Sequence, residues 1–137
     1  MKKRDQQSPR QAVECHPIGV AETPLETLGD APRQGRNAEI EGTLVLDPEY
    51  TDGLAGFDPG ERIVVVWFAE LADRETLKVN DGCRGVFRSR SQDRPNPICV
   101  TQCEIVEIAG NQLRVQGVDM LDGTPILDLK YPLNSGV

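Results

Sequence analysis

The chain has 137 residues, of which 38% are hydrophobic and 27% are charged, and its formal net charge is -7. This length can bury the core of one ordinary domain but not of two. The acidic balance argues against sequence-independent binding to a polyanion, although it allows a local basic site. No apolar run is long enough to cross a bilayer, and no apolar segment follows the basic start, so we expect a soluble, unexported, cytoplasmic protein without a membrane partner.

The cysteines and the single histidine do not form a recognisable metal motif. The cysteines are Cys15, Cys83, Cys99 and Cys103, and they lack the paired Cys-x2-Cys spacing of zinc folds. We therefore predict free thiols and no metal. His16 has no histidine partner and stands beside a proline, so we interpret it as structural or exposed rather than catalytic.

The first third of the chain combines short strands with loops. Residues 1–11 are polar and predict a flexible N-terminal tail ahead of a single domain at 12–137. Residues 12–22 are strand-like. Residues 23–37 contain two prolines and two glycines and predict a loop that is long enough to suggest a function.

The central part contains the clearest strand. Residues 38–46 alternate like a half-buried strand, and residues 47–61 form a turn-rich connection with room for one helical turn. The β-branched and aromatic run at 62–70 predicts a central strand with Trp67 and Phe68 in the core.

The remaining strands complete a mainly β fold. We predict a short helix or a loop at 71–79, and then strands at 84–89, 100–110, 111–120 and 124–130. Gly110-Asn111 indicates a hairpin, and residues 119–125 indicate a sharp turn. Seven short strands with at most one or two short helices favour a small closed or nearly closed β-barrel.

Common nucleotide motifs are missing from the sequence. There is no G-x-G-x-x-G segment that opens a helix after a first strand, and there is no P-loop. The sequence thus argues against a Rossmann dinucleotide site and against an ordinary methyltransferase site of that fold.

The arginine loop, residues 85–99 (GVFRSRSQDRPNPIC), concentrates arginines in an acidic chain and carries two prolines that stiffen it. If residues 84–89 form a strand, Arg88 and Arg90 alternate at its end and face one side, and Arg94 follows after a turn. Guanidinium groups at fixed positions suit a phosphate, a carboxylate or a purine edge. The alternative is a solvated loop whose arginines pair with Asp93 and nearby acids.

Five segments occur together in an order typical of one family. They are PIGV at 17–20, PRQG at 32–35, PEYTDGL at 48–54, GVFRSRSQDRPNPI at 85–98 and VDMLDGTPILDLK at 118–130. The sequence resembles the TsaA-like family over residues 13–131. RPNPI and DGTP are specific in combination, whereas each alone is a weak signal.

The resemblance implies an S-adenosyl-L-methionine-dependent methyltransferase with a TsaA-like β-barrel that acts as a homodimer. The family substrate is N6-threonylcarbamoyladenosine beside the tRNA anticodon, which is methylated at N6, so tRNA is the implied partner and no DNA is expected. By position in the motifs, the implied cofactor residues are Pro32, Arg33, Gln34, Glu70, Leu71, Arg90, Val100, Leu121, Asp122, Gly123 and Thr124.

Further roles follow from the chemistry of that reaction. The target nitrogen must lose a proton, for which Asp122 and Tyr131 are the candidate catalytic residues. Asp122 has the alternative role of a turn-forming aspartate before a glycine. We assign Arg88, Arg94 and Asn96 to tRNA binding, with surface salt bridges as the alternative for the arginines.

Three positions depart from the family pattern. Glu70 stands where the family typically has a histidine, Cys99 stands where a glycine usually follows RPNPI, and Tyr131 has exchanged places with the adjacent proline. These departures leave two alternatives open: a non-catalytic module that binds or senses S-adenosylmethionine, and a methyltransferase for a small molecule.

Overall fold

The computed structural model describes residues 11–27 and 40–133. Almost all of the predicted N-terminal tail and the second half of the predicted loop at 23–37 lie outside the described residues, and with them Pro32, Arg33 and Gln34 of PRQG.

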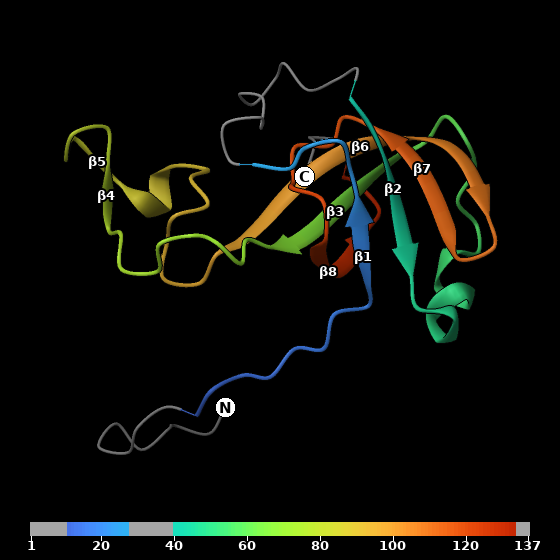
Figure 1. Cartoon of the computed structure of the whole chain (residues 1–137), viewed down its shortest axis with the longest axis horizontal. Helices are drawn as coiled ribbons and strands as arrows, with labels where there is room; N and C mark the ends of the chain where they lie inside the picture. Colours follow the sequence, from blue (N-terminus) through green and yellow to red (C-terminus); the bar gives the residue numbers. More distant parts are fainter. Residues whose placement is uncertain (1–10, 28–39, 134–137) are drawn as a thin grey trace.

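Six strands close into an antiparallel barrel in the order β1-β2-β7-β6-β3-β8 (Figure 1). Their bounds are β1 (Gly19–Glu22), β2 (Glu41–Leu46), β3 (Arg62–Phe68), β6 (Ile98–Ala109), β7 (Gln112–Gln116) and β8 (Thr124–Lys130). The barrel closes because β8 pairs with β3 on one side and with β1 on the other. The predicted mainly β fold with a small closed barrel is confirmed.

The barrel interior is filled by the aliphatic side chains that the sequence pattern placed inside. In β3 every residue from Ile63 to Trp67 is buried, as expected for a central strand. In β6 burial alternates through Thr101, Cys103 and Ile105, because successive side chains of a strand point to opposite faces. This tight packing gives a rigid frame for the loops at the barrel rim.

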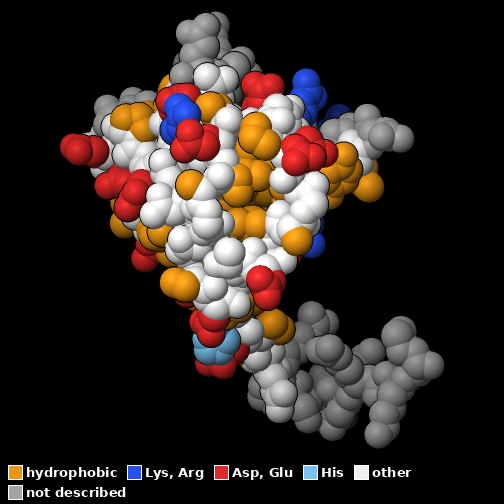
Figure 2. Space-filling model, turned by 90° about the vertical axis from the view of Figure 1, so that its right-hand side faces the viewer, with side chains coloured by type: hydrophobic (Ala, Val, Ile, Leu, Met, Phe, Trp, Pro, Cys, Tyr) orange, Lys and Arg blue, Asp and Glu red, His pale blue; other side chains and the backbone are white. Residues whose placement is uncertain are grey.

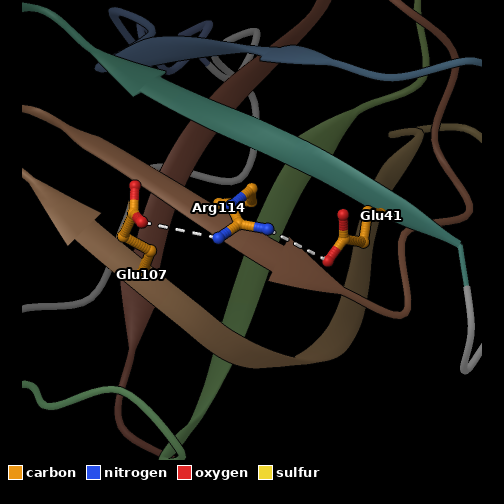
Figure 3. Close-up of polar contacts among 3 residues, drawn as sticks. All are labelled: Glu41, Glu107 and Arg114. Atoms are coloured by element: carbon orange, nitrogen blue, oxygen red, sulfur yellow. Dashed lines mark hydrogen bonds and ion pairs between the residues drawn. The ribbon is translucent and has the colours of Figure 1, made fainter.

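The outer face of the barrel carries ion pairs between neighbouring strands. Arg114 in β7 lies between Glu41 of β2 and Glu107 of β6, with a nitrogen-oxygen distance of 3.4 Å on each side (Figure 3). All three side chains are well exposed to solvent, so these pairs contribute little stability and mainly agree with the strand register.

The longest connection between two barrel strands projects from the barrel. Residues 69–97, which we call the excursion, connect β3 to β6 and project to one side of the barrel (Figure 1). They contain a separate two-stranded sheet of β4 (Lys78–Val79) and β5 (Arg84–Gly85), and the 3-10 helix η3 (Val86–Arg88). The excursion starts and ends at one point, since Phe68 pairs with Ile98 and the Ala69 N–H donates to the Pro97 carbonyl at 2.9 Å.

Two of the predicted connections are confirmed, whereas two predicted strands are shorter than expected. The turn-rich connection contains the 3-10 helix η2 (Pro48–Leu54), and Gly110-Asn111 joins β6 to β7 as a hairpin in which Gly110 has φ 61°. The predicted strand at 12–22 begins only at Gly19, after Pro17, and β7 ends before Gly117, whose φ is 102°.

The predicted strand at 84–89 is wrong beyond its first two residues. After β5 the chain turns into η3, where the backbone N–H and the hydroxyl of Ser89 both donate to the Val86 carbonyl, at 3.0 and 2.7 Å. Serine side chains offer the backbone local partners in place of a strand ladder. Arg88 and Arg90 are therefore not alternate residues at a strand end.

The side of the barrel away from the excursion has a mainly acidic surface. Figure 2 shows this side, on which Asp and Glu side chains predominate over Lys and Arg around patches of hydrophobic side chains. The excursion differs, because its lysine and arginines roughly balance its acids. Among the described residues, no helix is long and apolar enough to span a membrane.

Candidate functional site

Two adjoining cavities lie where the excursion meets the barrel rim. The larger has a volume of about 530 Å³ and is lined by the arginine loop and β6. The smaller, of about 180 Å³, is lined by the start of the excursion and by the turn before β8. Trp67 and Gln92 line both cavities, so the two share a wall.

The structure brings predicted cofactor residues from distant parts of the chain to these cavities. Arg90 and Val100 line the larger cavity. The smaller cavity is lined by Glu70, Leu71, Leu121, Asp122 and Thr124. Gly123 lies between the last two in the turn. A combined volume of several hundred Å³ falls within the usual range of small-molecule sites.

The turn at 121–124 has a fixed shape. The Thr124 N–H donates to the Leu121 carbonyl at 3.1 Å, and Gly123 has φ 84°, which a glycine adopts without strain. The Asp122 carboxylate accepts the backbone N–H of Thr23 at 3.0 Å. Asp122 thus has a structural role, but its partner is Thr23, just after β1, and not the backbone of its own turn.

The segment that carries PRQG is bracketed by residues attached to this same region. Before it, the Leu25 carbonyl accepts the Asp122 N–H at 2.7 Å. After it, the Ile40 carbonyl accepts the N–H groups of Gly117 and Val118 at 2.8 and 3.2 Å. Both flanks are therefore attached to the chain between β7 and β8. The roles of Pro32, Arg33 and Gln34 stay predictions.

Arg94 stabilises the conformation of the arginine loop through hydrogen bonds to the backbone of the loop. Its guanidinium donates to three backbone carbonyls: those of Ser91 at 2.7 Å, Val86 at 3.1 Å and Ser89 at 2.6 Å. The same side chain lines the larger cavity. These contacts indicate that Arg94 positions the loop, while its proposed contact with tRNA stays a prediction.

The other basic and polar residues of the loop differ in their exposure to solvent and in their hydrogen bonds. Arg88 and Arg90 are exposed, and Arg90 also lines the larger cavity. The Asn96 side-chain oxygen accepts a hydrogen bond from the Arg74 guanidinium at 3.2 Å, which also donates to the Pro95 carbonyl at 2.8 Å. The tRNA-binding roles of Arg88 and Asn96 stay predictions.

Tyr131 does not join the other site residues within one chain. β3 and β8 are antiparallel, so the start of β8 lies near Trp67 and its end lies near the start of β3. There the Tyr131 ring packs against Phe57 at a centroid distance of 6.0 Å, and its hydroxyl lies 3.3 Å from a Glu61 carboxylate oxygen, to which it donates. A catalytic role for Tyr131 stays a prediction that needs a second subunit.

Asp119 lines the larger cavity and was missed by sequence reasoning. The Trp67 indole N–H donates to the Thr101 hydroxyl at 3.0 Å, and that hydroxyl donates to the Asp119 carboxylate at 2.5 Å. Burial raises the pKa of Asp119 above its ordinary value, and the hydrogen bond from Thr101 opposes that increase. Its only sequence signal is its place at the start of the predicted turn at 119–125.

Cys99 lies in the wall of the larger cavity at the position that departs from the family pattern. Burial raises the pKa of its thiol from 9.0 to about 11, although the positive charge of Arg94 acts in the opposite direction. The thiol therefore stays protonated at neutral pH. Within residues 11–27 and 40–133, no group of His, Cys, Asp and Glu side chains is arranged to hold a metal ion.

An exposed aromatic ring stands at the mouth of the larger cavity. Phe87 lines this cavity while 78% of its surface remains accessible. Trp67, by contrast, is buried in the core and contributes to the cavity wall. Phe87 gives the arginine loop a flat apolar surface that sequence reasoning did not assign to the site.

Comparison with known proteins gives the family. The model of the N-terminal domain of tRNA-methyltransferase O, TrmO, matches residues 20–134. The chain belongs to the TrmO family. The resemblance drawn from five short segments is thereby confirmed, and TrmO is the proper reference for the fold and the site.

Relatives of this TrmO-family chain include two archaeal proteins of similar length. A probable S-adenosyl-L-methionine-binding protein of Halobacterium salinarum is 48% identical over 120 residues, which cover 86% of this chain and 97% of the relative. An S-adenosyl-L-methionine-binding protein of Archaeoglobus fulgidus is 41% identical over 118 residues, which cover 83% and 85%.

Solved TrmO structures have the same fold. The crystal structure of TrmO from Pseudomonas aeruginosa superimposes with a TM-score of 0.77 at 27% identity and covers 93% of this chain. A second TrmO crystal structure gives a TM-score of 0.77 at 28% identity. This chain spans only 57% and 59% of the length of those two TrmO chains.

Proposed function

We propose that the protein binds S-adenosyl-L-methionine in the two adjoining cavities and transfers its methyl group to N6 of threonylcarbamoyladenosine next to a tRNA anticodon. The observation that carries this proposal is the convergence of seven residues, predicted from family motifs, on two cavities with a shared wall. They are Glu70, Leu71, Arg90, Val100, Leu121, Asp122 and Thr124.

The lining of the cavities fits the chemistry of this cofactor. The guanidinium of Arg90 suits the carboxylate of the methionine part. Leu71 and Leu121 supply apolar surface for the adenine, and the fixed turn at 121–124 offers backbone groups to its polar edge. When bound, the cofactor supplies an activated methyl group on a positively charged sulfur.

The protein contributes mainly by positioning. Methyl transfer requires the sulfur, the methyl carbon and the attacking nitrogen to lie nearly in line, and a rigid barrel rim reduces the entropic cost of that arrangement. The prolines at 95 and 97 and the guanidinium of Arg94 fix the loop that forms one wall of the larger cavity. The remaining chemical need is an acceptor for the proton of the target nitrogen.

RNA is supported as the substrate class by the surface around the larger cavity. Phe87 offers a stacking surface for an unpaired base, and Arg88 and Arg90 offer exposed positive charge beside it. Anticodon loops present splayed bases to this kind of aromatic and arginine surface. A local site of this type is compatible with a net charge of -7 on the whole chain. A tRNA substrate also implies a cytoplasmic location.

A homodimer belongs to the proposal. Leu71 and Ile98 are large hydrophobic residues that stay exposed near the cavities of a single chain, at 71% and 46% accessibility. A second subunit would cover such residues. It would also be needed to bring Tyr131 of one subunit into contact with the site of the other. The exposed apolar surface therefore favours a dimer.

Calorimetric titration with S-adenosylmethionine, followed by methyl transfer to tRNA with and without the threonylcarbamoyl group, tests the proposal. We expect binding, and transfer only to the modified tRNA. Absence of binding would contradict the cofactor assignment. Binding with transfer to unmodified tRNA alone would contradict the substrate assignment.

The second candidate function is a sensor that binds S-adenosylmethionine without catalysis. It is favoured by the names of the relatives from Halobacterium salinarum and Archaeoglobus fulgidus, which mention binding only. Binding with no transfer to either tRNA, while small-molecule acceptors also stay unmethylated, is the result expected for a sensor. Transfer to a small molecule would instead indicate a methyltransferase that acts on small molecules.

A further inference from the structure

The proposed reaction leaves one chemical task without a residue. The target nitrogen carries a hydrogen between a purine ring and a carbonyl group, and the methylated product has lost that hydrogen. The two candidates from the sequence are placed poorly for this task. Tyr131 lies at the far end of β8. Asp122 is exposed and already accepts the N–H of Thr23.

We infer that the carboxylate of Asp119 accepts the proton of the target nitrogen. This inference rests on the proposed function. Asp119 lines the larger cavity together with Arg90 and Val100, both predicted to hold the cofactor. Asp119 thus forms part of the wall of the space in which cofactor and substrate would meet, although most of its side chain is buried.

The direction of the hydrogen bonds makes Asp119 an acceptor. An indole nitrogen only donates, so the Thr101 hydroxyl accepts from Trp67 and has its single proton left for Asp119. Asp119 is therefore the acceptor at the end of the chain Trp67-Thr101-Asp119. This hydrogen bond favours the ionised form of Asp119, which is the form that a proton acceptor needs before the reaction.

The acid strength of Asp119 suits this role. Burial raises its pKa, which makes the carboxylate a stronger base than an exposed aspartate, and the hydrogen bond from Thr101 acts in the opposite direction. The other ionisable groups that line the same cavity are Arg90, Asp93, Arg94 and Cys99, and the charge of Asp119 also acts on the thiols of Cys99 and Cys103 in β6.

Other acidic groups around the cavities are less suited. The Asp93 carboxylate accepts the N–H of Asp73 at 2.9 Å and so ties two parts of the excursion together. Glu70 is exposed and lines only the smaller cavity. The thiol of Cys99, with a pKa of about 11, is protonated when the reaction would run.

The step balances with groups already named. The target nitrogen forms a bond to the methyl carbon, the bond between that carbon and sulfur breaks with its electron pair on sulfur, and the N–H proton passes to the Asp119 carboxylate. The products are the N-methylated nucleoside, a neutral thioether and a protonated Asp119, which returns its proton to water after product release.

Single-turnover methyl transfer with Asp119→Asn tests the inference, with Asp128→Asn as a matched control. Asp128 pairs with Lys130 at the opposite end of β8, so its substitution removes the same charge away from the cavities. We expect Asp119→Asn to bind S-adenosylmethionine within about threefold of the wild type and to lose at least about 100-fold in rate, a typical contribution of a general base. Asp128→Asn should match the wild type.

A second pair of variants keeps the test decisive if Asp119→Asn does not fold. Thr101→Val removes the hydroxyl that lowers the pKa of Asp119, so the rise of the rate with pH should move to higher pH, whereas Thr101→Ser should restore it. The carboxyl ¹³C resonance of Asp119 in the cofactor-free protein should titrate at a higher pH in Thr101→Val than in the wild type.

Each outcome separates this inference from the proposed function. An active wild type with an equally active Asp119→Asn would overturn the role of Asp119 and leave the proposed function intact. Loss of cofactor binding in Asp119→Asn would make it a binding residue and also overturn the inference. A wild type that binds the cofactor but methylates no RNA would overturn the proposed function, and the role of Asp119 would fall with it.

Discussion

The backbone N–H of Thr23 donates to the carboxylate of Asp122 at 3.0 Å, although 99 positions separate the two residues in the chain. The Thr23 hydroxyl also donates to the Met120 carbonyl at 2.9 Å. The residue after β1 and the turn before β8 are therefore held together by two hydrogen bonds, and Asp122 at this junction lines the smaller cavity.

Substitution of Asp122 by alanine should weaken both the fold and cofactor binding. It leaves the Thr23 N–H without its acceptor, at a cost of about 1 kcal/mol, and releases the turn that lines the smaller cavity, so we expect about tenfold weaker binding of S-adenosylmethionine. Asp122→Asn retains a side-chain oxygen and should be close to the wild type in urea unfolding and calorimetry. Equal effects of the two substitutions would show that the charge matters more than the hydrogen bond.

Arg94→Ala should disrupt the arginine loop. The substitution removes the donor for the carbonyls of Val86, Ser89 and Ser91, so the free energy of unfolding should fall by about 1–3 kcal/mol, and cofactor binding should fall with it. Arg88→Ala removes an equal charge from an exposed position of the same loop and should cost less than about 0.5 kcal/mol. Arg94→Ala with wild-type stability in chemical denaturation would contradict the positioning role.

Phe87→Ala should affect RNA and not the cofactor. Base stacking on an aromatic ring contributes about 1–3 kcal/mol, so KM for the modified tRNA should rise roughly tenfold while calorimetry gives an unchanged Kd for S-adenosylmethionine. Leu77→Ala, an exposed apolar residue in the same excursion, is the control and should leave both quantities unchanged. An unchanged KM in Phe87→Ala would argue against stacking at this ring.

Cys103 should make the fold sensitive to alkaline pH. Burial raises the pKa of its thiol from 9.0 to about 12, so above pH 9 the unfolded chain releases a proton that the folded chain retains. The free energy of unfolding should then fall as pH rises from 9 towards 12, by up to about 1.4 kcal/mol per pH unit. Urea unfolding at pH 8 and pH 10 should give a smaller difference for Cys103→Ala than for the wild type. The thiol of Cys15 is exposed, so Cys15→Ala should show the same difference in free energy of unfolding between pH 8 and pH 10 as the wild type.

Gly19→Ala should damage the seam between β1 and β2. A Cβ at this position would lie 2.3 Å from the Val45 carbonyl oxygen and 2.8 Å from the Leu46 Cα, both in the backbone of the neighbouring strand. We expect a loss of at least about 2 kcal/mol and a lower Tm, because the backbone must move to relieve the overlap. At Gly85 a Cβ would meet nothing within 4 Å, so Gly85→Ala should unfold close to the wild-type temperature.

The strands of the barrel were predictable because their burial follows directly from residue type. The run from Ile63 to Trp67 and the alternation in Glu41–Leu46 have few other ways to bury their apolar side chains. The 3-10 helix at Val86–Arg88 was not predictable in this way. Its valine and phenylalanine favour a strand, and the turn is held by the backbone N–H and hydroxyl of Ser89 and by the guanidinium of Arg94.

Family motifs name some residues of the candidate site in advance. Residues such as Asp119, whose place in the site depends on burial in the folded barrel, could not be predicted from the sequence. Family motifs name Arg90, Val100 and the turn at 121–124, and these residues line two adjoining cavities, while their contact with the cofactor stays a prediction. Asp119 stands in the same motif as Asp122, and the residue types are identical. What distinguishes them is burial against Thr101 and Trp67, which is a property of the folded barrel.

The excursion begins and ends between two residues that are paired in the barrel, Phe68 and Ile98. We expect insertions, deletions or changes of charge in residues 70–96 to leave the strand register of the barrel as it is, because the Phe68–Ile98 pair and the Ala69–Pro97 hydrogen bond enclose them. The pairing that closes the barrel is thus independent of the segment that carries most of the arginine loop. Side chains of this segment that line the cavities can therefore change with little effect on the pairing of the barrel strands.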